Sequence, residues 1–135
     1  MPTAAIIGGG VIGSAWASRC LLNGWEVRFH DPAPNSNAVL NKVLDKARRW
    51  VPQVYDRLPA EGTLTLCTSI TDAVNGADWV QESTPERLEI KQAVLAEIQG
   101  SCAVEAIVAS STSGFMPSEL QAGSARPEQI LVAHP

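Results

Sequence analysis

A glycine-rich turn near the N-terminus is the first group of residues whose types and spacing could do chemistry. Gly8, Gly10 and Gly13 form the pattern G-x-G-x-x-G between an apolar, strand-like run and a helix-compatible segment, and this context predicts a dinucleotide-binding loop. Gly8 would permit the tight turn, Gly10 would let the backbone approach a pyrophosphate, and Gly13 would let helix and strand pack closely. The unpaired N–H groups at the helix start, including those of Val11 and Ile12, favour an anion. The alternative is a glycine-rich turn without a ligand.

Asp31 is an acidic partner for this turn. It lies 18 residues after Gly13, at the end of the second strand-like run. A carboxylate there can accept hydrogen bonds from both hydroxyls of an adenosine ribose, and it repels a 2′-phosphate, so the predicted cofactor is NAD rather than NADP. The alternative is an ordinary turn residue before Pro32.

Hydroxyl groups and a histidine follow the last two strand-like runs. The loop from Ser110 to Gly114 reads Ser-Ser-Thr-Ser-Gly, and His134 comes directly after the final apolar run. Beside a nicotinamide, a histidine base and a hydroxyl suit the oxidation of an alcohol, in which the base removes the hydroxyl proton. The residues alone leave a turn-and-cap cluster before Pro117 and an incidental histidine as equal alternatives.

Strand-like and helical patterns alternate along the chain and must position these groups. We expect strands at 4–7, 26–31, 63–67, 79–83, 106–109 and 130–133, and helices at 11–23, 37–58, 71–76, 86–99 and 117–122. Such alternation predicts an α/β fold, a doubly wound Rossmann fold whose six-stranded, mostly parallel sheet carries helices on both faces. The four tryptophans are expected mostly in the core.

Length and composition indicate a single domain and limit the classes of partner that the chain is expected to bind. It has 135 residues, of which 45% are hydrophobic, and a net charge of −4, so a nucleic-acid or anionic-membrane partner is not expected. No apolar run approaches the ~20 residues of a membrane span. The three cysteines are odd in number and far apart, which disfavours a disulfide framework or a metal site and indicates a cytoplasmic protein.

Four segments together resemble the NAD-binding domain of the 3-hydroxyacyl-CoA dehydrogenase superfamily: the glycine turn with Asp31, residues 81–91, residues 110–114, and the ending at 133–135. The resemblance covers essentially the whole chain. It implies that His134 is the catalytic base, that Ser113 holds the substrate oxygen near the nicotinamide ribose, and that Glu86 and Lys91 contact the nicotinamide end of NAD. From the residues alone, Glu86 and Lys91 are an exposed helix face.

Departures from the acyl-CoA members narrow the implied substrate. Those members usually carry Ser-Asn-Thr-Ser-Ser, where this chain has Ser111 and Gly114, and they have a longer lysine-rich insert after the second strand. These departures favour a small, free 3-hydroxy acid. The stretch 110–123 together with 133–135 most resembles the carnitine-oxidising members of the superfamily, which implies oxidation of L-carnitine to 3-dehydrocarnitine. Oxidation of gulonate or of a 3-hydroxyacyl-CoA is the first alternative. A non-catalytic dinucleotide-binding or crystallin-like module is the second.

The resemblance also implies residues beyond this chain. Family members carry a C-terminal helical domain that closes the substrate cleft and forms a homodimer. We therefore expect residues 1–135 to be the NAD-binding domain of a longer enzyme, and to bind NAD while showing little activity alone.

Overall fold

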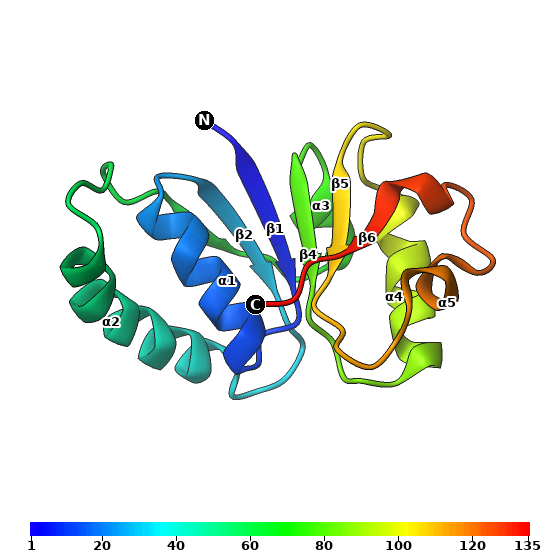
Figure 1. The fold of residues 1–135 in the computed structure, drawn as a ribbon, viewed down its shortest axis with the longest axis horizontal. Helices are drawn as coiled ribbons and strands as arrows, with labels where there is room; N and C mark the ends of the chain where they lie inside the picture. Colours follow the sequence, from blue (N-terminus) through cyan, green and yellow to red (C-terminus); the bar gives the residue numbers. More distant parts are fainter.

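The computed structural model describes all 135 residues and contains one six-stranded sheet, in the order β3-β2-β1-β4-β5-β6 (Figure 1). Every neighbouring pair of strands is parallel. The strands are Thr3–Ile7 (β1), Glu26–His30 (β2), Leu64–Leu66 (β3), Trp79–Glu82 (β4), Ile107–Ser110 (β5) and Ile130–Val132 (β6). The predicted doubly wound Rossmann fold is confirmed, and the sheet is wholly rather than mostly parallel.

Helices cover both faces of the sheet (Figure 1). Helices α1 (Val11–Leu22) and α2 (Ser36–Val54) pack on the first half of the sheet, around a core that contains Ile6 and Phe29. On the opposite face lie α3 (Ile70–Val74), α4 (Leu88–Gln99) and α5 (Pro117–Gln121), and a 3₁₀ turn, η1 (Pro127–Gln129), precedes β6. None of these helices combines the length and the apolar character that crossing a membrane requires.

The strand order reverses between β1 and β4, and this reversal sets where a ligand can bind. From β1 the following strands, β2 and β3, are added toward one edge of the sheet. From β4 the following strands, β5 and β6, are added toward the opposite edge. In sheets of this kind the loops at the carboxyl ends of the strands diverge at the reversal and leave a crevice. The glycine turn after β1 and the loops after β4 and β5 therefore meet at one edge.

The structure corrects two predicted helix boundaries. Helix α2 continues through Pro52 and ends at Val54 rather than at 58, because Tyr55 is extended, with φ −117° and ψ 128°. Helix α4 begins at Leu88, because Arg87 is extended, with φ −130° and ψ 124°. Glu86 was expected within this helix and instead lies in the loop before it.

The tryptophans follow expectation only in part: none of the four is fully buried, although Trp16 and Trp25 pack against the core beneath α1 and α2. Trp50 is 58% exposed on α2. Trp16 of α1 and Trp79 of β4 stack with their ring centroids 6.3 Å apart, and both are partly buried, as is Trp25. Trp79 is in register with Ala4, so its side chain lies on the sheet face that α1 and α2 cover, at the margin of α1.

The amphipathic helix α2 gives a test of this packing. Leu40 and Leu44 are 1% and 3% exposed against the sheet, while Lys42 between them is exposed. Leu40→Ala should lower the free energy of unfolding by about 2–5 kcal/mol, because it removes apolar contacts and leaves a cavity. Lys42→Ala, the matched control, should change it by less than about 0.5 kcal/mol. Urea denaturation measures both, and equal effects would contradict the packing of α2.

Candidate active site

The glycine turn between β1 and α1 is shaped by close backbone contacts. Gly8 has φ +100°, and a Cβ on it would lie 2.5 Å from the carbonyl oxygen of Ser83. A Cβ on Gly13 would lie 1.8 Å from the carbonyl oxygen of Gly8, which only glycine allows. Around Gly10 there is open space within 4 Å. The turn thus brings α1 against β1 and leaves room for a ligand over Gly10.

Gly9 is a further constrained position that the sequence analysis did not single out. A Cβ on Gly9 would lie 2.4 Å from Cζ of Phe29, and its N–H donates to Oδ2 of Asp31 at 2.5 Å. The other carboxylate oxygen of Asp31 accepts from the N–H of Ala33 at 2.8 Å. Asp31 therefore has the turn role expected as the alternative, and it also fastens β2 to the glycine turn. The sequence signal for this position was the run of three consecutive glycines, Gly8 to Gly10.

A groove of about 730 Å³ runs beside this turn, within the range of about 300–1,000 Å³ that small-molecule sites occupy. Gly8, Gly10 and Asp31 line it together with residues of the loop after β4. Helix α1 begins there without a side-chain cap and without an acidic residue in its first turn, so its first N–H groups are available to an anion. These residues fit a dinucleotide, with the pyrophosphate at Val11 and Ile12.

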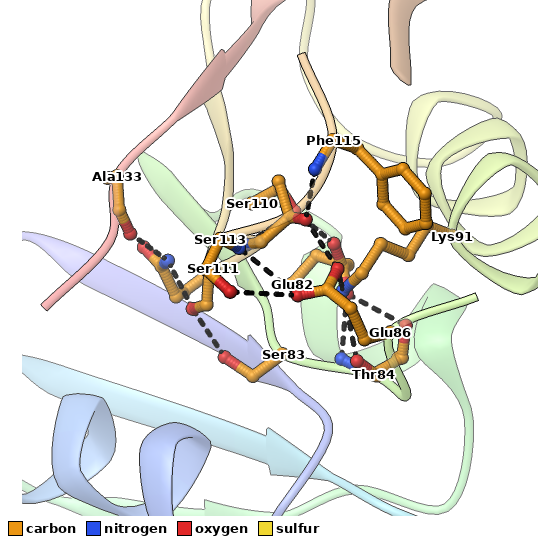
Figure 2. A network of polar contacts seen from close by, with 12 residues as sticks. Glu82, Ser83, Thr84, Glu86, Lys91, Ser110, Ser111, Ser113, Phe115 and Ala133 are labelled. Carbon is orange, nitrogen blue, oxygen red and sulfur yellow. Dashed lines mark hydrogen bonds and ion pairs between the residues drawn. The ribbon is translucent and has the colours of Figure 1, made fainter. Parts of the chain in front are cut away.

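A buried ion pair lies at the carboxyl end of β4 (Figure 2). Glu82 is 0% exposed and Lys91 is 2% exposed, and Nζ of Lys91 lies 2.8 Å from Oε2 of Glu82. The same oxygen accepts from the N–H and the hydroxyl of Thr84, both at 2.7 Å. The other oxygen accepts from the hydroxyl of Ser110, and Lys91 also donates to the carbonyl of Thr84 at 3.0 Å.

This pair changes the interpretation of Lys91 and adds a residue. Lys91 is not on an exposed helix face, so that alternative is wrong; its ammonium group points inward from α4 to Glu82 (Figure 2). The sequence analysis missed Glu82. The available signal was a carboxylate at the end of a strand whose neighbours are buried, because such a charge requires a partner.

Glu86 connects the loop after β4 to the loop after β5. Its carboxylate accepts from the hydroxyl of Thr112, from the N–H of Ser113 at 3.1 Å and from the hydroxyl of Ser113 at 3.4 Å. Nζ of Lys91 lies 3.9 Å away. Burial raises the pKa of Glu86, but the hydrogen bonds and the charge of Lys91 outweigh it, so the net pKa is lowered. The structure thus brings together Glu86, Lys91 and Ser113.

His134 is not hydrogen-bonded to that group. Its ring makes no hydrogen bond to Ser113 or to any other residue, and it lines a hollow of about 210 Å³ with Trp16 and Arg19 of α1. The backbone before it is fixed, since the N–H of Ala133 donates to the carbonyl of Ser110 at 2.9 Å. His134 therefore follows β6 at the same edge of the sheet as the hydroxyl loop after β5, but without a hydrogen bond to Ser113.

The three cysteines are free thiols spread over the molecule. Burial raises the pKa of Cys20 to about 11, although Arg19 acts in the opposite direction, so this thiol remains protonated at neutral pH. No three histidine, cysteine or acidic side chains come close enough together to hold a metal ion.

Comparison with known proteins gives a consistent family. Residues 3–135 match the family described as 3-hydroxyacyl-CoA dehydrogenase, NAD binding domain. The L-carnitine dehydrogenase/betainyl-CoA thioesterase of Ruegeria pomeroyi is 55% identical over 136 residues, covering 100% of this chain and 28% of that protein. The L-carnitine dehydrogenase of Oceanobacillus iheyensis is 44% identical, covering 100% of this chain and 44% of that protein. The chain thus spans less than half the length of these curated relatives.

Solved structures agree with this family. The NAD⁺-dependent 5-formyl-3-hydroxy-2-methylpyridine 4-carboxylic acid 5-dehydrogenase is 36% identical with a TM-score of 0.88, covering 99% of this chain and 44% of that one. The 3-hydroxybutyryl-CoA dehydrogenase of Escherichia coli is 27% identical with a TM-score of 0.79, covering 98% of this chain and 29% of that one.

The buried pair predicts a large difference between two similar substitutions. Lys91→Met should lower the free energy of unfolding by about 3–5 kcal/mol, because it leaves the buried Glu82 carboxylate without a cation. Arg87→Met should cost less than about 1 kcal/mol, because the Arg87–Glu89 pair is exposed, at 68% and 65%. Urea denaturation at neutral pH compares the two variants. Similar small losses would show that the buried pair does not hold this edge together.

Proposed function

Because the chain belongs to the 3-hydroxyacyl-CoA dehydrogenase family through its NAD-binding domain, we propose that it is the cofactor half of an enzyme that oxidises L-carnitine to 3-dehydrocarnitine. The observation that supports L-carnitine as the substrate is the 55% identity, over the whole chain, to a relative named for L-carnitine dehydrogenation. Further relatives named L-carnitine dehydrogenase, at 40–48% identity, support it.

The proposed cofactor site follows the groove. The N–H groups of Val11 and Ile12 bind the pyrophosphate over Gly10, and the carboxylate of Asp31 accepts from the adenosine ribose. Glu86 and Ser113 bind the nicotinamide end, and the positive charge of Lys91 keeps the carboxylate of Glu86 ionised. When bound, NAD supplies the hydride acceptor.

The proposed chemistry uses two residues that follow neighbouring strands. His134 acts as general base and removes the proton from the C3 hydroxyl of the substrate, while the Ser113 hydroxyl donates a hydrogen bond to the reacting oxygen. Their places at the carboxyl ends of β6 and β5 support these roles, since this edge is where ligands bind in doubly wound folds.

The length of the relatives supports a second domain. We propose that residues 1–135 are the NAD-binding domain, and that a C-terminal helical domain completes the substrate cleft and forms a homodimer. We also propose a cytoplasmic enzyme that acts on small molecules. The net charge of −4 supports the absence of nucleic-acid or anionic-membrane partners.

The catalytic proposal predicts the effect of removing the base. In the longer protein that contains this chain, His134→Gln should lower kcat for L-carnitine oxidation by about 10²–10⁴-fold, because general base catalysis contributes that much. The dissociation constant for NAD should stay unchanged, since His134 lies outside the groove. NADH absorbance and calorimetry measure the two quantities. No turnover of L-carnitine, alongside robust turnover of gulonate or 3-hydroxybutyryl-CoA, would overturn the substrate.

The cofactor proposal predicts a preference that depends on Asp31. The chain should bind NAD at least about tenfold more tightly than NADP, because the carboxylate repels a 2′-phosphate. Asp31→Asn keeps an oxygen to accept from the Gly9 N–H but removes the charge, and it should reduce the preference by about tenfold. Calorimetric titration with both dinucleotides tests this, with the melting temperature as a control for folding. An unchanged preference would show that Asp31 does not choose the cofactor.

A further inference from the structure

A buried amide, Gln81, connects three segments at the carboxyl edge of the sheet. Gln81 is 0% exposed, and its Oε1 accepts from the indole N–H of Trp79 at 2.9 Å. Its Nε2 donates to the hydroxyl of Ser111 at 2.8 Å and to the carbonyl of Ala133 at 3.0 Å. Both amide hydrogens and the amide oxygen are therefore used, by β4, by the loop after β5 and by the backbone before His134.

The partners of Gln81 determine which way its amide faces. An indole N–H only donates and a backbone carbonyl only accepts, so Oε1 must face Trp79 and Nε2 must face Ala133. The second hydrogen on Nε2 then points to Ser111, whose oxygen must accept it. Hydrogen-bond direction at this site is thus set by chemistry and has one solution.

The direction continues from Ser111 to Ser83. The two hydroxyl oxygens lie 2.7 Å apart, and either could donate on distance alone (Figure 2). Ser111 is 7% exposed, and its hydroxyl has no other acceptor than Ser83. A buried hydroxyl hydrogen without an acceptor is unfavourable, so Ser111 donates to Ser83. The hydrogen of the Ser83 hydroxyl is then left for another acceptor.

Ser83 lies where a bound dinucleotide can supply that acceptor. It is partly exposed and lines the groove with Gly8, Gly10 and Asp31. Its side chain also faces the glycine turn, because a Cβ added to Gly13 would lie 3.4 Å from Cβ of Ser83. Oxygens of the diphosphate and of the ribose next to it are the acceptors that approach a turn of this kind.

We propose that the Ser83 hydroxyl donates a hydrogen bond to an oxygen of the dinucleotide, on the diphosphate or on the nicotinamide-side ribose, and that Trp79, Gln81 and Ser111 fix its direction. The inference rests on the proposed dinucleotide site. It adds a binding residue at the end of β4, and it makes Gln81 a positioning residue for both Ser83 and the backbone before His134.

The first experiment removes the hydroxyl alone. Calorimetry on the chain should show that Ser83→Ala weakens NAD and ADP-ribose binding by about three- to tenfold, as the loss of one hydrogen bond predicts. AMP binding should be unchanged, because AMP has neither a diphosphate nor a second ribose. ADP separates the two acceptors: weaker ADP binding assigns the diphosphate, and unchanged ADP binding assigns the ribose.

Ser101→Ala is the matched control. The Ser101 hydroxyl also pairs with another hydroxyl, that of Thr71 at 3.2 Å, and it lies outside the groove. Its removal should leave NAD binding unchanged. Unchanged NAD binding in Ser83→Ala would overturn the role of Ser83 and leave the proposed dinucleotide site standing. Absence of NAD binding by the unsubstituted chain would overturn the dinucleotide site as well.

The second experiment tests the direction of the relay. Gln81→Met keeps the size of the side chain but removes the amide donor to Ser111. The oxygen of Ser111 can then accept from the hydroxyl of Ser83, whose hydrogen turns away from the groove. Gln81→Met should therefore weaken NAD binding, and the double variant with Ser83→Ala should bind no more weakly than Ser83→Ala. Losses that multiply would overturn the relay. If Gln81→Met does not fold, the comparison of Ser83→Ala with Ser101→Ala still decides the proposal.

Discussion

The buried carboxylate of Glu82 is the interaction on which the edge of the sheet depends. A charge without solvent is costly unless a cation and hydrogen bonds surround it. Glu82 has all of these, from Lys91, Thr84 and Ser110, which belong to α4, to the loop after β4 and to β5. One carboxylate therefore holds three segments in a single arrangement, because release of any of them leaves a buried polar group unsatisfied.

The position of Glu86 follows from this arrangement. Lys91 reaches inward to Glu82, and its ammonium group is close enough to Glu86 to favour the ionised carboxylate there. Glu86 in turn accepts from the backbone and the hydroxyl of Ser113. The partly exposed carboxylate of Glu86 thus orders the loop after β5, and the position of that carboxylate depends in turn on the buried pair of Lys91 and Glu82.

Local patterns predicted the sheet and the glycine turn, whereas the polar contacts at its edge depended on residues distant in sequence. The G-x-G-x-x-G turn was identified because its glycines are required by contacts within a short stretch of chain, as Gly8 and Gly13 show. The start of α4 was misplaced because Glu86 bonds to the loop after β5, 26 and 27 residues away, instead of to its own helix. Lys91 was misread for the same reason, since helical periodicity gives no sign of a buried carboxylate nine residues earlier.

Strand β4 organises both sides of the sheet through two consecutive residues. Because side chains alternate along a strand, Gln81 faces the side of α1 and α2, and Glu82 faces the side of α4. Gln81 holds the backbone before His134 and the hydroxyl of Ser111, which pairs with that of Ser83, while Glu82 holds α4 and Ser110. An amide suits the first position because it must donate and accept at once, and a carboxylate suits the second because it accepts from every partner. Exchange of the two residue types would leave donors facing donors on one side and acceptors facing acceptors on the other, so their order in β4 is itself a requirement of the site.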